Sequence, residues 1–127
     1  MTLEEYQKQA MTTCMASSEN FSYMFLNLVG EVGEFASKIA KLIRKEVMYI
    51  GENNSQNKLL VKSNDIDGCT SIKIKRELKK EAGDILWQLS GLCDVMGWSL
   101  EEVAQQNLDK LASRKERNVI DGSGDNR

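Results

Sequence analysis

Residues 21–47 read FSYMFLNLVGEVGEFASKIAKLIRKEV, and this stretch decides the fold. Apolar residues recur in it at three- and four-residue steps, the period at which one side of an α-helix faces a protein core. Its first nine residues are apolar almost all round, so burial of a single face cannot account for them. The stretch therefore predicts a long helix whose first half is covered by a further partner, such as another subunit.

The same period predicts three more helices in the chain. They are a first helix from the capping box of Thr2 and Glu5 to about Ser17, a third over residues 70–97 that Gly97 ends, and a fourth from the capping box of Ser99 and Glu102 to about Asn118. The chain contains no proline, so nothing forces these helices to break. We expect one all-α domain over residues 1–127, a four-helix bundle that forms oligomers.

Two segments lack the helical period. Residues 49–70 are rich in Gly, Asn, Ser and Asp, which predicts a long loop inserted between the second and third helices. Within it, the apolar run 59–61 and the turn pair Asp67-Gly68 suggest a small hairpin. Residues 119–127 are rich in Gly and Asp and predict an irregular tail.

The composition excludes several classes of function. The chain has no histidine, which rules out imidazole catalysis and histidine zinc sites within one chain. Its net charge of −2 argues against a general binder of nucleic acids or anionic membranes, and no stretch resembles a signal peptide or a membrane span. Cys14, Cys69 and Cys93 form no CxxC pair, which is typical of reduced thiols in a cytoplasmic protein.

Two pairs of acids carry the strongest chemical signal. Glu31 and Glu34 lie three residues apart on the second predicted helix, and Glu81 and Asp84 have the same spacing on the third. Side chains at this spacing are neighbours on a helix surface and can reach one cation. Carboxylates alone, with no histidine or cysteine, favour a hard ion such as Mg²⁺ or Mn²⁺. The pattern predicts a metal site, although surface charge alone would also explain any single pair.

Glycines flank both acid pairs at Gly30, Gly33 and Gly83, although glycine weakens a helix by about 1 kcal/mol relative to alanine. Their presence suggests that the space is needed for close helix approach or for a ligand. Lys38 and Lys41 follow the first acid pair, and their simplest interpretation is a solvated helix face.

The fourth predicted helix carries a cationic edge. Asn107, Lys110, Arg114 and Arg117 follow one another at helical steps, which suits the binding of phosphate groups. Basic residues near a helix C-terminus also complement the helix dipole, so the pattern has a structural explanation too. Trp87, one turn beyond Asp84, is a candidate for stacking on a base or for the core. Tyr49 is a weaker stacking candidate.

These motifs resemble the MazG-like all-α nucleoside triphosphate pyrophosphohydrolases, the group that includes dimeric dUTPases and dCTP pyrophosphatases. The resemblance rests on GEVGE at 30–34, EAGDILW at 81–87, NLDKL at 107–111 with Arg114, and GSGDNR at 122–127. It implies Mg²⁺-dependent hydrolysis of a nucleoside triphosphate to the monophosphate and pyrophosphate by a homodimer or homotetramer. It further implies that Glu31, Glu34, Glu81 and Asp84 hold the metal ions and that Lys110 and Arg114 bind phosphate oxygens.

The chain departs from this group in one respect. The 46 residues between Glu34 and Glu81 are more than is usual, which affects the geometry of the lid and of base recognition rather than the metal site. Glu34 is the expected general base, and removal of unwanted nucleotides is the expected role. Two other functions stay open: a metal- and nucleotide-binding regulator without turnover, and a helical interaction module whose acids are surface charge.

Overall fold

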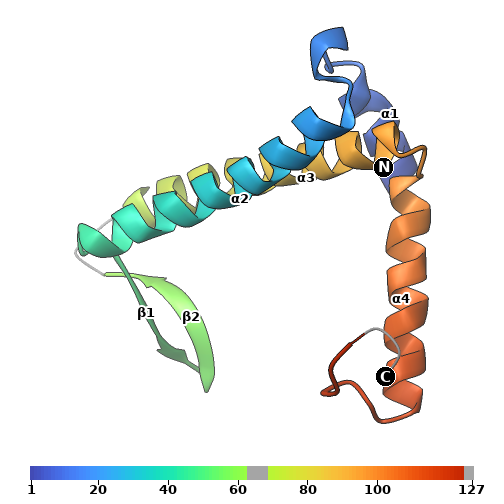
Figure 1. Ribbon diagram of the computed structural model, residues 1–127. Coiled ribbons are helices and arrows are strands. Elements are labelled where there is room, and N and C mark those ends of the chain that lie inside the picture. The colour runs from blue at the N-terminus through green and yellow to red at the C-terminus, as the bar shows by residue number, and fades with distance from the viewer. Residues whose placement is uncertain (63–68, 125–127) are drawn as a thin grey trace. The chain divides into compact units, whose positions relative to one another are not determined.

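The computed structural model describes residues 1–62 and 69–124. Their elements are, in order, α1 (Leu3–Met11), the 3₁₀ helix η1 (Ala16–Ser18), α2 (Phe21–Arg44), β1 (Met48–Asn53), β2 (Gln56–Val61), α3 (Cys69–Val95) and α4 (Leu100–Glu116) (Figure 1). The four predicted helices are present. The prediction of an all-α fold is wrong for residues 48–61, which form a two-stranded antiparallel sheet.

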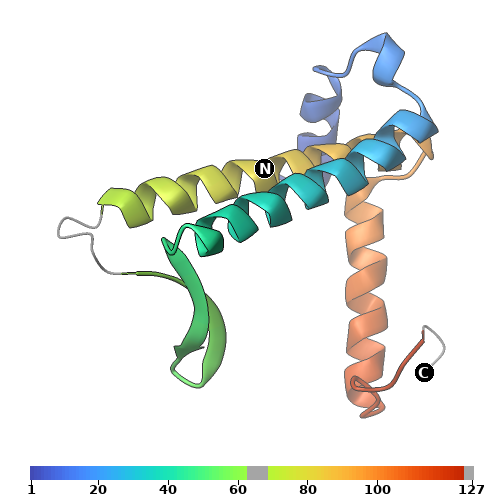
Figure 2. The same ribbon diagram turned by 60° about the vertical axis from the view of Figure 1, so that its left-hand side comes forward.

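The chain divides into two compact units. One unit comprises Met1–Phe21 and Ser90–Arg127, and the other comprises Ser22–Leu89. In the second unit α2 and α3 run side by side in opposite directions, and the β-hairpin follows the C-terminal end of α2 (Figures 1 and 2). This helix pair carries both acid pairs.

Three of the helices end in the same backbone motif, in which one residue adopts a positive φ. These residues are Glu46 after α2 (φ 58°), Gly97 after α3 (φ 70°) and Asn118 after α4 (φ 55°). After α2, the amide of Val47 donates to the carbonyl of Leu42 at 3.0 Å, which is the six-residue bond of a Schellman motif. The motif explains why α2 ends at Arg44 and not at the predicted Val47.

The hairpin pairs Met48 with Val61 at its base and Asn53 with Gln56 at its tip. Asn54 and Ser55 form the turn with positive φ angles of 52° and 59°, a conformation that matches the twist of the strands. The apolar run 59–61 of the predicted hairpin lies in β2, but the turn at Asn54-Ser55 was not predicted, because this pair lacks the glycine that marks most turns of this kind. Asp67-Gly68 lies outside the described residues.

Tyr49 lies across its own strand. Its ring covers Gly51, where an added Cβ would come within 2.8 Å of a ring carbon. The side chain is still 41% exposed. The ring therefore packs on the hairpin, and its predicted role in base stacking stays a prediction.

Gln7 holds the first unit together. Its side chain is buried at the meeting point of α1, the end of α3 and the start of α4. The Nε2 atom donates to the carbonyls of Trp98 (3.0 Å) and Ser90 (3.4 Å), while Oε1 accepts from the amide of Leu100 at 2.8 Å. One amide therefore satisfies an otherwise orphaned donor at the start of α4 and two carbonyls near the end of α3.

Side-chain hydrogen bonds set the ends of the helices in this unit. The capping box of Thr2 and Glu5 is confirmed, and the hydroxyl of Ser99 accepts from the amide of Glu102. However, α1 ends at Met11 and not near Ser17. The hydroxyls of Thr12 and Thr13 donate to carbonyls three residues earlier, which offers the backbone an alternative to further helix.

Cys14 and Cys93 are free thiols, as predicted. Burial raises the pKa of both above the ordinary value, so both stay protonated at neutral pH. Over the described ranges, none of the helices has the combination of length and hydrophobicity that crossing a membrane requires.

Candidate metal centre

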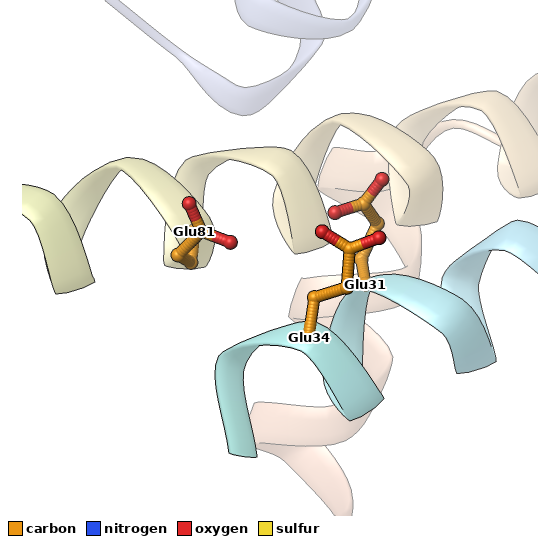
Figure 3. A group of neighbouring side chains, drawn as sticks. All are labelled: Glu31, Glu34 and Glu81. Atoms are coloured by element: carbon orange, nitrogen blue, oxygen red, sulfur yellow. The ribbon is translucent and has the colours of Figure 1, made fainter. Parts of the chain in front are cut away.

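Three carboxylates meet between α2 and α3. Glu31 and Glu34 project from successive turns of α2 toward α3, which carries Glu81 (Figure 3). One oxygen from each of the three groups lies within 4.8 Å of the other two. Glu81 is buried, Glu31 is half-buried and Glu34 is exposed. The cluster is thus open to solvent on the side of Glu34, and its oxygens are close enough to share one cation.

The electrostatics of Glu31 reflect this crowding. Burial raises the pKa of Glu31, and the negative charges of Glu34, Asp84 and Glu81 raise it further. Lys38 acts in the opposite direction. A site that disfavours its own negative charge in this way would be stabilised by a bound cation.

Lys38 is the feature that sequence reasoning missed. Its Nζ donates to Oε1 of Glu81, which forms an ion pair between α2 and α3. The Glu81 side chain is 9% exposed and that of Lys38 is 44% exposed, so the pair joins a buried charge to the surface. The hydrogen bond to Glu81 raises the pKa of Lys38. Lys38 is partly exposed, as a solvated face requires, but that interpretation did not include its ion pair with Glu81.

Asp84 stands apart from the other three acids. It is exposed and is not part of the group whose oxygens converge. It still lies close enough to Glu31 to raise the pKa of that carboxyl. The structure therefore brings together three of the four predicted ligands and leaves the fourth at the edge of the cluster.

The donor set fits a hard divalent ion, because all three groups offer carboxylate oxygens. Of the two explanations offered for the flanking glycines, close helix approach and space for a ligand, the structure does not support the first. A Cβ built at Gly30, Gly33 or Gly83 would meet no described atom within 4 Å apart from its chain neighbours and the nearby backbone of its own helix. Close approach of the described helices therefore does not require these glycines, and space for a ligand stays a prediction.

The remaining predicted site residues lie in different settings. Trp87 is half-buried in the same unit as the cluster. Asn107 and Lys110 are exposed on α4, in the other unit. Arg114 is only 6% exposed, and its Nη2 donates to the carbonyl of Gly124 at 3.2 Å, so its guanidinium binds the C-terminal tail at Gly124.

Comparison with known proteins places these observations in a family. The sequence model of the MazG nucleotide pyrophosphohydrolase domain matches residues 19–119. The chain belongs to the MazG family. The match includes the helix pair with all three clustered carboxylates. MazG proteins generally depend on a divalent metal, in agreement with the acidic cluster found here.

One similar protein aligns with most of this chain. The Gene 37 protein of Mycobacterium phage L5 is 38% identical over 111 residues, which cover 87% of this chain and 80% of the relative. Its name states no activity. No solved structure matches the chain.

Proposed function

We propose that this protein is a divalent-metal-dependent hydrolase that converts a nucleoside triphosphate to the monophosphate and pyrophosphate. The observation that carries the proposal is the convergence of Glu31, Glu34 and Glu81 in a chain of the MazG family. Mg²⁺ is the proposed ion, and Mn²⁺ is an alternative with the same preference for oxygen ligands. The proposed role is removal of unwanted nucleotides in the cytoplasm.

The carboxylates have distinct proposed roles. Glu31, Glu34, Glu81 and Asp84 would hold the metal, with Asp84 at the edge of the group. A bound divalent ion supplies charge neutralisation of the triphosphate and a more acidic water. The carboxylate of Glu34, the exposed member of the cluster, would take the proton of the water that attacks a phosphorus atom and so breaks the bond between the α- and β-phosphates. Buried Glu81 would serve binding rather than proton transfer, because solvent reaches it least.

Substrate contacts outside the metal centre remain proposals. Asn107, Lys110 and Arg114 would contact the substrate, with the two basic side chains on its phosphates, and Trp87 would stack on its base. Lys110 is exposed and available for such a contact. The contact of Arg114 with Gly124 means that phosphate binding by Arg114 would require the tail to move or to bind beside it.

The exposed apolar face of α2 supports self-association as a homodimer or homotetramer. In the unit formed by Ser22–Leu89, five large apolar side chains on this helix are 39–66% exposed. They are Tyr23, Phe25, Leu26, Val29 and Val32. Several large exposed apolar side chains on one stretch of helix are typical of a protein interface. A second copy of the chain would supply the covering partner that the sequence of α2 predicts.

The decisive experiment measures pyrophosphate release. Purified protein is incubated with a panel of ribo- and deoxyribonucleoside triphosphates at millimolar Mg²⁺, with Mn²⁺ and EDTA as parallel conditions. We expect release from at least one nucleotide, loss of release in EDTA, and at least a hundredfold lower kcat in the Glu34→Gln variant. Glu52→Gln, an exposed acid on the hairpin, is the matched control and should retain full activity.

Two results would contradict the proposal. If the protein binds nucleotides but releases pyrophosphate from no member of the panel, it would be a regulator without turnover. Absence of both nucleotide and metal binding would favour a helical interaction module.

A further inference from the structure

A line of apolar side chains runs along most of α2. Its members follow one another at alternating steps of four and three residues, and they are Phe25, Val29, Val32, Ala36, Ile39 and Ile43. This spacing is that of the a and d positions of a coiled coil, which keeps the side chains on one side of a helix. These six residues form the α2 seam, which extends well beyond the apolar start of the helix.

The α2 seam is open to solvent in the unit formed by Ser22–Leu89. Five of its six members are exposed, and Ile39 is half-buried. The three large side chains of its first half, Phe25, Val29 and Val32, are 46–59% exposed. An exposed seam with this spacing is typical of a helix that pairs with another helix.

A second copy of α2 matches the seam when the two helices run in opposite directions. The steps of 4, 3, 4, 3 and 4 residues read the same from either end, so every member of the seam meets a member of the other copy at its own level. The facing pairs are Phe25 with Ile43, Val29 with Ile39, and Val32 with Ala36. The same surface is thus used on both copies, as a two-fold symmetric dimer requires.

The charges of α2 favour this antiparallel orientation. Lys38, Lys41, Arg44 and Lys45 all lie toward the end of the helix or directly after it. In a parallel pair each of them would lie at the level of its own copy, and like charges repel. In the antiparallel pair they lie at the levels of residues 23–30 of the second copy, which include no charged residue.

Small residues border the seam and allow two helices to approach closely. Gly33 and Ala40 each follow a seam residue directly, and Gly33 lies beside the middle of the seam. A Cβ built at Gly33 would meet no described atom within 4 Å apart from its chain neighbours and the nearby backbone of its own helix. Packed helices lie about 8–10 Å apart, and small side chains at the contact favour the shorter distance. A second copy would therefore give Gly33 the close helix approach that the single chain lacks.

The acidic cluster lies on the other side of α2. Glu34 is two positions from both Val32 and Ala36, which is about 200° around the helix. Pairing through the seam therefore leaves Glu34 accessible to solvent and to a substrate.

We propose that α2 pairs with α2 of a second copy as an antiparallel, two-fold symmetric coiled coil through the α2 seam. The two-fold axis passes beside Gly33 and Glu34, at the level midway between Val32 and Ala36. This inference deepens the self-association in the proposed function, on which it rests, by assigning the surface, the orientation and the register. It does not depend on turnover.

The first test measures the mass of the full chain by sedimentation equilibrium without nucleotide. Val32→Glu would bury two like charges beside the two-fold axis. The matched control is Ile72→Glu, which changes an apolar α3 side chain that is 62% exposed and lies outside the seam. We expect the mass of the assembly to fall by half or more in Val32→Glu and to stay unchanged in Ile72→Glu. Circular dichroism checks the fold, and because Val32 is 50% exposed, glutamate should leave the single chain folded.

The second test measures the orientation with a short bifunctional maleimide. Eighteen residues separate Phe25 from Ile43, so the two copies of either residue lie about 27 Å apart in the antiparallel pair. We expect the double variant Phe25→Cys, Ile43→Cys to form a covalent dimer, and each single variant to form none. The unmodified protein is the control for reaction of the native cysteines.

Three outcomes would overturn the inference. They are a single chain as the only species of the unmodified protein at all concentrations, an unchanged mass in Val32→Glu, and a covalent dimer of either single cysteine variant, which would indicate a parallel pair. The proposed hydrolysis fails on a different measurement, since it requires pyrophosphate release from a nucleotide by the unmodified protein.

Discussion

Replacement of Gln7 by leucine tests how the first compact unit is held together. The side chain is 7% exposed, so leucine, which has a similar volume, would fill most of the same space. Leucine cannot replace the bond from the amide of Leu100 to Oε1 (2.8 Å) or the bond from Nε2 to the carbonyl of Trp98 (3.0 Å). The longer bond to the carbonyl of Ser90 (3.4 Å) is also lost.

The expected cost follows from these three bonds. A buried polar group left without its partner costs about 1–3 kcal/mol, and two of the three bonds are short enough to count fully. The third bond is long and adds less, and the greater hydrophobicity of leucine offsets roughly 1 kcal/mol. We therefore expect Gln7→Leu to lower the free energy of unfolding by about 3 kcal/mol. For a chain of this size, such a loss lowers Tm by roughly 10 °C.

Urea denaturation followed by circular dichroism, at one protein concentration, measures the change. Gln9→Leu is the control, because Gln9 lies on the same helix but is exposed. That variant should stay within about 0.5 kcal/mol of the unmodified protein. If the two variants lose the same stability, or Gln7→Leu loses less than about 1 kcal/mol, the hydrogen bonds of Gln7 do not stabilise the unit as argued.

Three further predictions concern the metal centre and α4. The pKa of Glu31 is raised in the folded state, so its contribution to stability is full at low pH and is lost as the pH rises through that pKa. Glu31→Gln should therefore raise Tm in EDTA at pH 7.5 but hardly at pH 4; an equal shift at both values would contradict this. Mg²⁺ at ten times its Kd should stabilise the protein by about 1.4 kcal/mol in thermal unfolding. Glu34→Gln should remove that gain, and a gain of the same size in the variant would argue against this ligand. Ser99→Ala removes the cap of α4 and should cost about 1 kcal/mol in urea denaturation, whereas no loss would mean that solvent replaces the cap.

The sequence by itself was sufficient to predict the parts of the fold that depend on interactions between residues close together in the chain. The apolar period predicted all four helices, and the cap at Thr2 and the turn at Gly97 were predicted from residue type. These features form through hydrogen bonds between residues only a few positions apart, so the local sequence contains the information they need. The acid pairs were visible for the same reason, since a three-residue spacing already places two carboxylates on neighbouring turns.

Only the tertiary structure decided what happens between elements. The pairing of Lys38 with Glu81 joins residues 43 positions apart and depends on how α2 packs beside α3. The same packing brings Glu81, but not Asp84, into the carboxylate group, and the fold-back of the tail places Gly124 against Arg114. In the hairpin, the turn lies at Asn54-Ser55 because pairing with β1 sets the register. Such contacts depend on the relative rotation and shift of whole elements, which residue spacing within one element does not determine.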